Sequence, residues 1–491
     1  MCGDFTDPPT VIFGSSPLSC HMVPPLDPHI FRAYDIRGRA HLEIDAHVCT
    51  LIGQAFGSIL RERYKTEHPT VVVGRDARTH GKEFEVATSK GLQSAGCHVK
   101  SIGQTPTPVN YFILAENGFD ASVQVTASHN PKEDNGLKLQ VRGAEAFSGE
   151  DIQILRRRIE AKDFLTAEGS YEEIEAIEPY SQQLVKRFAG AGKGLTVAID
   201  NGNGITGPVY NHILQDVGCK VIELYSDPDG TFPNHIADPS KRATLTILQE
   251  TVREQQASLG LAFDGDGDRV GFIDETGAIR SADEILLLLA HDHLERHPGA
   301  PIVFTVSNSS TLETEIRKWG GEPIMCKVGH SFVEHAMREH DSLLGGEQSG
   351  HYFPGEFTAG YDDALVSALQ VLAIYSNEKR GTNNEKLAFS SLFEDFPKVF
   401  QAHELRPHCP DSEKTRIVKA ITAHFKKSYP VNDLDGARID FGDGAWAGVR
   451  QSNTSPCLSV CMEARSEAKL KEMGGIVLEH LKTYPEINLA S

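Results

Sequence analysis

The chain repeats one plan three times, and this repeat limits the folds that it can adopt. A short apolar strand runs into a polar loop at residues 71–73, 197–199 and 302–304. A helical stretch and a new strand follow each loop, and a glycine ends each helical stretch: Gly96, Gly218 and Gly320. Strand, helix and strand in this order form a βαβ unit, which builds parallel or mixed sheets with helices on both faces. We therefore predict three similar α/β/α units with mixed sheets.

The C-terminal part of the chain does not follow this plan. Its pattern predicts helices at 412–427 and 467–482, and strands at 438–441, 446–449 and 458–464. A length of 491 residues also favours three or four domains, at about 100–200 residues each. We predict a tail at 1–27, α/β domains at 28–175, 176–278 and 279–395, and a smaller α+β domain at 396–491.

Composition and charge exclude several classes of protein. The net charge of -20 argues against a nucleic-acid or membrane-surface partner, so an anionic substrate would require the few cations to gather in one cleft. The nine cysteines form no CxxC pair, which favours free thiols in a reducing cytosol. The N-terminus has no signal-peptide pattern, and the longest aliphatic run, 285–289, is too short to span a bilayer. We expect a cytoplasmic protein with a loose, proline-rich N-terminal tail.

The segment 123–131 places a serine at the end of a strand. Val123 and Val125 alternate as a strand that leads to Ser128, with the imidazole of His129 beside it. We expect Asn135 and Gly136 to form a tight turn before a second strand at 137–141, which carries Lys138. These residue types are also ordinary in surface turns. The alternative is that Ser128 is a nucleophile or a phosphate carrier.

Each repeat delivers one loop from an equivalent strand end, and the three loops differ in chemistry. They occupy residues 128–131, 264–269 and 346–351. The three loops occupy matching positions, and all of them contain chemically reactive or charged side chains. Chance is therefore a poor explanation for the pattern. We therefore expect the loops to act together.

The second loop is acidic. In extended chain, Asp264, Asp266 and Asp268 would point to one side and repel one another unless a cation lay among them. Hard oxygen ligands select Mg²⁺, Mn²⁺ or Ca²⁺, and three carboxylates leave coordination positions open for a phosphoryl oxygen. Arg269 could hold another phosphate oxygen or balance charge. Glu275 stands at the twelfth position of an EF-hand, but Arg269 occupies the sixth, where that loop requires glycine.

Three further segments carry chemistry. Arg450, Ser452, Asn453 and Thr454 suit a phosphate. Glu347 and Ser349 suit sugar hydroxyls, although for this loop taken alone a plain turn is the better explanation. Residues 327–330 contain a cation and an imidazole, and two arginines flank Tyr34. For the segment around Tyr34, a structural salt bridge between Arg32 and Asp35 is an alternative to a substrate-binding site. Together these features indicate phosphoryl transfer, with Ser128 as the carrier.

The loops also carry a resemblance to a known family. Residues 126–131, 264–269, 346–351 and 450–456 resemble, in the same order, the four signature loops of the α-D-phosphohexomutase superfamily. Within it, residues 31–38, 232–235 and 453–456 look most like the bacterial phosphomannomutase/phosphoglucomutase group. The match covers roughly residues 28 to 485, and it is specific because four separate motifs agree.

This resemblance implies four domains around a central cleft and an enzyme that moves phosphate between O1 and O6 of a hexose. It implies a phosphorylated Ser128, a hexose 1,6-bisphosphate intermediate, and Mg²⁺ held by Ser128, Asp264, Asp266 and Asp268. The implied catalytic residues are Ser128, His129, Lys138, Arg37, Arg269 and His330. The implied substrate-binding residues are Tyr34, Lys327, Gly329, Glu347, Ser349, His351, Arg450, Ser452, Asn453 and Thr454. We expect sugar phosphates as partners, and a monomer or weak dimer.

Two positions depart from the pattern of the group. Ser307 stands where members often carry lysine, and Gln348 stands where methionine is common and where phosphoglucosamine mutases carry glutamine. Residues 452–456 fit the mannose/glucose group better than the glucosamine group. We therefore expect glucose and mannose phosphates as the substrates, with glucosamine phosphate as the second candidate substrate.

Two other classes remain as rivals. A serine hydrolase is disfavoured because neighbouring strand residues, such as Ser128 and His129, point to opposite faces, and because no G-x-S-x-G elbow is present. A calcium-binding module would leave the serine and phosphate loops unexplained.

Overall fold

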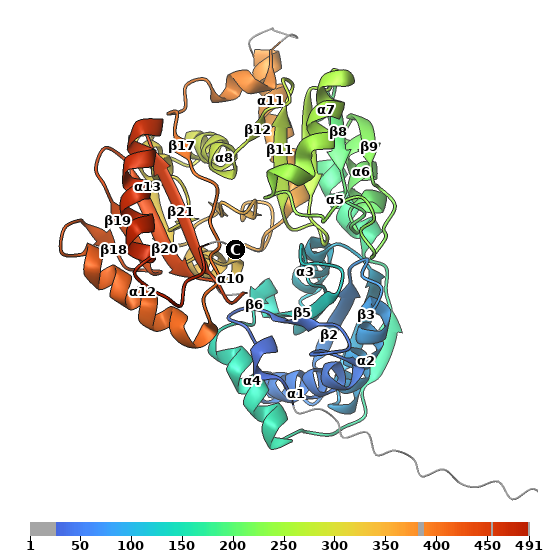
Figure 1. Cartoon of the computed structure of the whole chain (residues 1–491). Helices are drawn as coiled ribbons and strands as arrows, with labels where there is room; N and C mark the ends of the chain where they lie inside the picture. Colours follow the sequence, from blue (N-terminus) through green and yellow to red (C-terminus); the bar gives the residue numbers. More distant parts are fainter. Residues whose placement is uncertain (1–25, 382–386, 453–454, 490–491) are drawn as a thin grey trace, which may run out of the picture.

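The computed structural model describes residues 26–381, 387–452 and 455–489, so the predicted tail lies almost wholly outside the described residues. Three α/β domains follow one another along the chain, and a fourth domain closes the arrangement beside the third (Figure 1). Short 3₁₀ helices connect the larger elements, at Pro28–Ile30, Arg142–Ala144, Arg242–Leu245 and Phe389–Phe393.

Domain 1 contains a mixed sheet with helices on both faces. The strand order is β1 (Ile36–Arg39), β5 (Asp134–Val141), β4 (Ala121–Val125), β2 (Thr70–Arg75), β3 (His98–Gln104) and β7 (Ser170–Glu173), with β6 (Glu145–Ala146) paired to β5. Val71 and Val73 share a core with α1 (Ala46–Tyr64), α2 (Gly81–Ser94) and α4 (Glu150–Ala161). Val72 points to the opposite face, in a core with α3 (Thr107–Glu116). This alternation is the period of two that a strand covered on both sides requires.

Domains 2 and 3 repeat the arrangement with fewer strands. The sheet of domain 2 has the order β12 (Ile279–Arg280), β11 (Val270–Asp274), β10 (Leu259–Phe263), β8 (Thr196–Asp200) and β9 (Lys220–Leu224). Its helices are α5 (Ile177–Arg187), α6 (Gly207–Asp216) and α7 (Thr246–Glu254). The sheet of domain 3 has the order β14 (Glu322–Cys326), β13 (Pro301–Thr305), β15 (Gly345–Gly346) and β16 (Tyr352–Phe353). Its helices are α8 (Ala282–Arg296), α9 (Ser310–Lys318), α10 (His330–Glu339) and α11 (Ala364–Gly381).

Domain 4 is different in kind, as its sequence pattern predicts. Its strands are antiparallel throughout, in the order β17 (Phe400–Gln401), β21 (Leu458–Ala464), β20 (Trp446–Gln451), β19 (Ala437–Asp440) and β18 (Val431–Asn432). The helices α12 (Asp411–Phe425) and α13 (Glu467–Leu481) contribute to a core of its own.

The threefold repeat is confirmed in the pairing of the strands. In each of domains 1 to 3 a central strand, β2, β8 or β13, pairs in parallel with the strand that follows the helix. On its other side it pairs in parallel with β4, β10 or β15, and the latter three each turn back into an antiparallel neighbour. Gly96, Gly218 and Gly320 all have positive φ angles, of 94°, 106° and 80°, as the end of a helix often requires. The three loops therefore leave equivalent strand ends.

The tight turn predicted at Asn135 and Gly136 is wrong. Both residues lie inside β5, where Gly136 is the partner of Arg37 in β1. The chain reverses earlier, within residues 128–133, so glycine serves close packing here instead of a turn. A Cβ atom on Gly136 would lie 2.1 Å from the carbonyl oxygen of Ile36.

No helix among the described residues is long and apolar enough to cross a membrane.

Replacing Gly91 with alanine should destabilise domain 1. Gly91 in α2 faces α1, and an added Cβ would lie 2.1 Å from the carbonyl oxygen of Thr50. The helices must move apart, and overpacking of this kind costs about 1–3 kcal/mol. Gly475 is the matched control, because it lies within α13 with no atom within 4 Å of an added Cβ. Thermal unfolding should show a lower midpoint for Gly91→Ala and none of this loss for Gly475→Ala; equal midpoints would contradict the close contact of α1 and α2.

Candidate active site

The serine loop of domain 1 and the acidic loop of domain 2 meet directly. Ser128 is buried, and its Oγ donates a 2.7 Å hydrogen bond to Asp264 Oδ2. Gly265 lies so close that a Cβ there would be 2.6 Å from the carbonyl oxygen of Ser128. The two loops that the sequence singles out thus form one site across a domain boundary.

A strained backbone orients Ser128. Its φ of 51° lies in the left-handed region, which is uncommon for residues other than glycine. The Ser128 N–H donates to Thr126 Oγ1 at 2.8 Å, and Thr126 Oγ1 donates to Asp76 Oδ2 at 2.7 Å. These bonds hold the hydroxyl toward the acidic loop.

The expectation that Ser128 and His129 point to opposite faces is wrong. Ser128 Oγ lies 3.0 Å from His129 Nδ1. The strand ends at Val125, so the alternation of a strand does not apply to the two residues, and the turn brings their side chains together. Burial and the guanidinium groups of Arg269 and Arg37 hold the pKa of His129 well below its usual range.

One buried arginine fixes the whole serine loop, and the sequence patterns do not reveal it. The guanidinium of Arg78 donates to four carbonyl oxygens, those of Ser128, Asn130, Pro131 and Asp134, at 2.7–2.8 Å. Its Nε donates to Asp76, which neutralises its charge. Arginine alone offers five donors in a rigid fork that can bind this many acceptors.

The acidic loop is a turn and not the extended chain that the sequence predicts. Gly267 has a φ of 80°, and the backbone N–H groups of Gly267, Asp268 and Arg269 all donate to Asp264 Oδ1 at 3.0–3.2 Å. The three carboxylates still converge, with ligand atoms within 4.8 Å of one another. Wrapping around one carboxylate, and not alternation, brings them together.

Lys138 from domain 1 enters this carboxylate cluster. Its Nζ donates to Asp266 Oδ2 at 2.8 Å and is also bonded to Asp268. Burial alone would lower the pKa of Lys138, but Asp266 and Asp268 outweigh it and raise the pKa well above its usual value. Burial and the neighbouring carboxylates raise the pKa of Asp264. Burial opposes the ionisation of Asp268, yet Lys138, His351 and Arg269 outweigh it and lower its pKa.

The cluster retains free acceptors that suit a divalent cation. Among the described residues, the buried oxygens Asp266 Oδ1 and Asp268 Oδ1 have no hydrogen-bond partner. Such orphaned carboxylate oxygens are costly without a cation, and oxygen ligands are those that Mg²⁺ prefers. The donor set, with Asp264 Oδ2 beside Ser128, therefore fits the metal site that the sequence predicts.

Arg269 is held in place by a histidine. Arg269 Nε donates to His351 Nε2 at 2.7 Å, and His351 Nδ1 lies 2.6 Å from Asp362 Oδ2. Burial and Arg269 lower the pKa of His351 to about 4, so its ring is neutral and can accept this bond. Burial and Asp268 raise the pKa of Asp362 to about 7. His351 is predicted among the substrate-binding residues, whereas no sequence motif marks Asp362.

Arg37 lies on the other side of Ser128. Its Nη1 donates to Asn130 Oδ1 at 3.3 Å, and its Nη2 lies 2.6 Å from Asp35. The alternative salt bridge between Arg32 and Asp35 is wrong, because Arg32 lies 3.7 Å from Asp411 in α12 and Asp35 pairs with Arg37.

His330 and Tyr34 also lie at this side of the site. His330 Nε2 is 4.0 Å from Asp35, and its ring meets that of Tyr34 edge-on at 4.8 Å. Burial lowers the pKa of His330 and raises that of Tyr34. Both rings are therefore uncharged near neutral pH.

The third loop, from domain 3, contacts the segment around Gly329. Glu347 Oε1 accepts from the backbone N–H of Gly329 at 2.7 Å, and Ser349 Oγ donates to Glu347 Oε2 at 3.4 Å. Gly329 has a φ of 137°, and a Cβ there would be 2.8 Å from the Tyr34 ring. Lys327 is exposed at the edge of this group.

The C-terminal loop is held by two cations from other segments, Arg406 and Lys414, which no sequence motif marks. Ser452 is buried, and its Oγ accepts from Arg406 at 3.1 Å. Lys414 donates to the carbonyl oxygens of Ser452 and Ser455 at 2.8 and 2.9 Å. Arg450 lies at the end of β20, and the predicted residues Asn453 and Thr454 lie outside the described residues.

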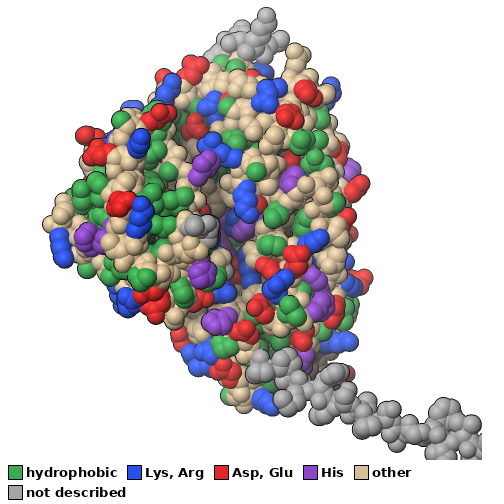
Figure 2. All heavy atoms as spheres, viewed as in Figure 1, with side chains coloured by type: hydrophobic (Ala, Val, Ile, Leu, Met, Phe, Trp, Pro, Cys, Tyr) green, Lys and Arg blue, Asp and Glu red, His purple; other side chains and the backbone are tan. Residues whose placement is uncertain are grey.

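The two departures from the family pattern lie close together. Ser307 and Arg450 line a small cavity with Arg438 and Cys461. Gln348 Oε1 is 3.8 Å from the sulfur of Cys461. Figure 2 shows a furrow beside domain 4, with basic and histidine side chains along it. Cations from different domains thus gather at one face, as an anionic substrate requires.

Comparisons with known proteins agree with this geometry. Four models of phosphoglucomutase/phosphomannomutase match in order: α/β/α domain I at residues 28–166, domain II at 178–277, domain III at 281–396 and the C-terminal domain at 404–479. The phosphomannomutase/phosphoglucomutase of Pseudomonas aeruginosa is 38% identical over 466 residues, which cover 95% of this chain and 98% of that protein.

Solved structures show the same likeness. The crystal structure of a phosphoglucomutase/phosphomannomutase family protein from Burkholderia thailandensis matches with a TM-score of 0.85 and 34% identity, covering 94% of this chain and 99% of that one. Structures of N-acetylphosphoglucosamine mutase from Aspergillus fumigatus, one with glucose 1,6-bisphosphate and one with GlcNAc-6P and magnesium, match in fold at TM-scores of 0.56 and 0.55, with 13% and 14% identity. Each covers 91% of this chain and 94% of that one.

The fold and the site thus define a four-domain protein of the α-D-phosphohexomutase type. The chain belongs to the phosphoglucomutase/phosphomannomutase family. The predicted family and fold class are confirmed, with three α/β/α domains and a C-terminal α+β domain.

Replacing Arg78 with lysine should reduce activity while the net charge is unchanged. Lysine is a point donor and cannot bind four carbonyl oxygens, so the serine loop would lose its fixed shape. Misplacement of a reacting group by about 1 Å costs about 10²-fold in rate, and we expect a loss of this size in kcat/KM. Arg142→Lys is the control, because Arg142 lies on the surface and pairs with Asp120. Steady-state kinetics of both variants would decide; equal rates would show that Arg78 does not position Ser128.

Proposed function

We propose that this protein is a phosphohexomutase, an isomerase that interconverts hexose 1-phosphates and hexose 6-phosphates, with mannose and glucose phosphates as the leading substrates. The observation that carries the proposal is the contact of Ser128 with Asp264 inside a cluster of carboxylates with unpaired oxygens. A serine hydrolase has no use for such a cluster. A calcium-binding module would not need the buried, strained serine.

Ser128 would act as the phosphate carrier. In the first half-reaction the bond between phosphorus and Ser128 Oγ breaks, and a bond forms from phosphorus to the free hydroxyl oxygen of the hexose phosphate. The product of this step is a hexose 1,6-bisphosphate. In the second half-reaction its other phosphate returns to Ser128, which releases the isomerised hexose phosphate. Such transfers depend on positioning and on charge stabilisation.

The residues around Ser128 would stabilise the transferring group. Mg²⁺ held by Asp264, Asp266, Asp268 and the phosphoserine would neutralise charge that develops on the phosphoryl oxygens. Arg269 presents a guanidinium fixed by His351 and close to Asp264. Lys138 remains charged while Asp266 and Asp268 are ionised, so it would contribute electrostatically.

The proton of the attacking hydroxyl needs an acceptor. His129 and His330 are neutral near pH 7, because burial lowers the pKa of each. A neutral imidazole can accept a proton, whereas Lys138 must first lose its own. Of the two histidines, we favour His129 as the proton acceptor because its Nδ1 lies 3.0 Å from Ser128 Oγ.

The two remaining loops would read the rest of the substrate. Glu347 and Ser349 offer an acceptor and a donor for sugar hydroxyls in either orientation of the ring. Arg450 and Ser452, with Arg406 next to Ser452, would hold the phosphate that is not transferred. Asn453 and Thr454 would complete this site, and Tyr34, Lys327, Gly329 and His351 would complete the surroundings of the sugar.

Glucosamine phosphates are the second candidate substrate class. Gln348 favours them, and the related Aspergillus fumigatus structures bear the name N-acetylphosphoglucosamine mutase. The name of the Pseudomonas aeruginosa relative, at much higher identity, favours mannose and glucose phosphates. The two Aspergillus fumigatus structures contain glucose 1,6-bisphosphate in one case and GlcNAc-6P with magnesium in the other, which supports a metal ion and a sugar bisphosphate as an intermediate or activator. A monomer or weak dimer remains our prediction.

The alanine variant of Ser128 should lose nearly all mutase activity while keeping the fold. A coupled assay primed with a hexose 1,6-bisphosphate would compare mannose, glucose and glucosamine 1-phosphates. We expect kcat to fall by about 10³-fold or more, because the carrier hydroxyl is removed. The protein should also lose the phosphoryl group that intact-mass measurement would find on the wild type.

Ser122→Ala is the matched control for this variant. Ser122 lies in β4, and its buried Oγ has no hydrogen-bond partner among the described residues. Full activity of Ser128→Ala would refute the mechanism. A wild type that acts on glucosamine 1-phosphate alone would replace our substrate assignment with the second candidate.

Chelation and a single substitution test the metal site. Removing divalent cations should abolish turnover, and Asp266→Asn should lower kcat by about 10²-fold, since one anionic ligand and part of its stabilisation are lost. Adding Mg²⁺ should restore the chelated wild type, and the variant should need more Mg²⁺ for half-maximal rate. Undiminished activity in excess chelator would show that the carboxylates bind no metal needed for catalysis and only form ion pairs with Lys138.

A further inference from the structure

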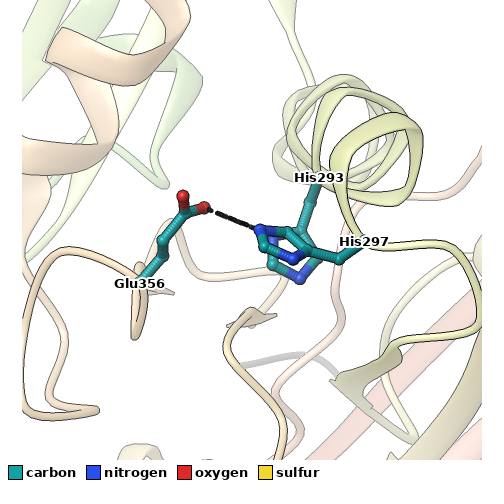
Figure 3. A group of neighbouring side chains, drawn as sticks. All are labelled: His293, His297 and Glu356. Atoms are coloured by element: carbon teal, nitrogen blue, oxygen red, sulfur yellow. Dashed lines mark ion pairs between the residues drawn. The ribbon is translucent and has the colours of Figure 1, made fainter.

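A second group of possible metal ligands lies outside the four loops. His293 and His297 stand one turn apart at the C-terminal end of α8, and Glu356 comes from the segment that follows β16. In Figure 3 the two imidazole rings lie one behind the other in the view, and the carboxylate of Glu356 reaches toward them. None of the three residues contributes to the candidate active site described above.

The spacing of these groups suits one small cation. Glu356 Oε2 lies 3.6 Å from His293 Nδ1 and 3.7 Å from His297 Nε2. One ligand atom from each residue lies within 4.8 Å of the others. Tetrahedral zinc with ligands at about 2.0–2.1 Å requires ligand atoms about 3.4 Å apart. Small changes in side-chain torsion would close the remaining gaps.

An unpaired nitrogen atom is the second observation. His293 is only 3% exposed, and its Nδ1 is the ring nitrogen that lies near Glu356. On His297 the ring nitrogen that lies near Glu356 is Nε2, and this buried atom has no hydrogen-bond partner among residues 26–381, 387–452 and 455–489. Buried polar atoms are rarely left without partners, and those that are often indicate a bound ion. A metal would satisfy the nitrogen of His297 directly.

The charges around the cluster allow a cation. The C-terminal end of α8 carries a partial negative charge, which favours a cation. Arg296 donates to both oxygens of Glu356 at 2.6 Å, and Asp292 lies 2.8 Å from Arg296 and offsets its charge. Each carboxylate oxygen has two lone pairs, so Oε2 can accept from Arg296 and still bind a metal.

We propose that His293, His297 and Glu356 form a second metal site, which binds a transition-metal ion of the zinc class. Two imidazoles and one carboxylate are ligands that favour Zn²⁺, whereas the oxygen-only triad of Asp264, Asp266 and Asp268 favours Mg²⁺. Water would fill the remaining positions.

The site would hold the segment of domain 3 that contacts domain 2. The backbone carbonyl of Glu356 accepts from Arg187 at 3.1 Å, and the guanidinium of Arg187 lies 4.5 Å from the ring of Phe357. Phe357 also contacts Phe188, with ring centroids 5.3 Å apart. Arg187 and Phe188 belong to the end of α5 in domain 2. A metal that holds Glu356 to α8 would therefore stabilise the contact between domains 2 and 3.

Cobalt is the probe that tests the proposal. Full-length protein freed of transition metals, with Mg²⁺ kept at saturation to fill the acidic triad, would be titrated with Co²⁺ and then with Zn²⁺. We expect one equivalent of Co²⁺ to give visible d–d bands without a thiolate charge-transfer band, and Zn²⁺ to displace it. Zn²⁺ should also raise the midpoint of thermal unfolding by several degrees.

Two variants on the same helix provide the comparison. His297 is 41% exposed, so His297→Ala should fold normally, and it should lower Co²⁺ affinity by about 100-fold or more and remove the thermal shift. His291→Ala is the control, because His291 is 45% exposed on α8 and is not one of the three ligands; it should bind as the wild type does. Equal Co²⁺ affinity in wild type and His297→Ala would overturn the proposal. A thiolate band, or an equal loss in His291→Ala, would also overturn it.

Discussion

The repulsion among three buried carboxylates is the constraint on which the rest of the site depends. Asp264, Asp266 and Asp268 lie within 4.8 Å of one another and are almost fully screened from water. Such a group persists only with positive charge beside it. Lys138 supplies that charge from a different domain. Its ion pairs with Asp266 and Asp268 therefore hold domain 1 against domain 2. The contact between the two domains also brings Ser128 against Asp264, so the carrier hydroxyl lies next to the cation site.

Much of the architecture follows from local patterns in the sequence. Strand, helix, glycine and strand recur at fixed spacing, and the parallel pairing of β2, β8 and β13 with their neighbours is what this order predicts. Equivalent strand ends then deliver the loops to one face. Periodicity works here because each element buries its own apolar face, so its type is encoded within a short stretch.

Contacts between distant residues could not be predicted in this way. Arg78, Arg406 and Lys414 are single cations outside any motif, yet they hold the serine and C-terminal loops through carbonyl and hydroxyl groups. The proximity of His129 to Ser128 depends on a positive φ angle, which a pattern of strand alternation does not contain. The Asn135-Gly136 pair is typical of a tight turn, and the turn predicted there is wrong. Glycine is required at position 136 because the neighbouring strand β1 lies too close for a side chain.

The four carbonyl contacts of Arg78 mean that the serine loop is not a portable motif. Arg78 precedes Ser128 by 50 residues, so the loop and the group that shapes it are encoded far apart. Grafting residues 126–134 onto another scaffold would transfer the hydroxyl without its orientation. The smallest transferable unit is the central part of the domain 1 sheet, with β2, β4 and β5 and the turn that carries Arg78.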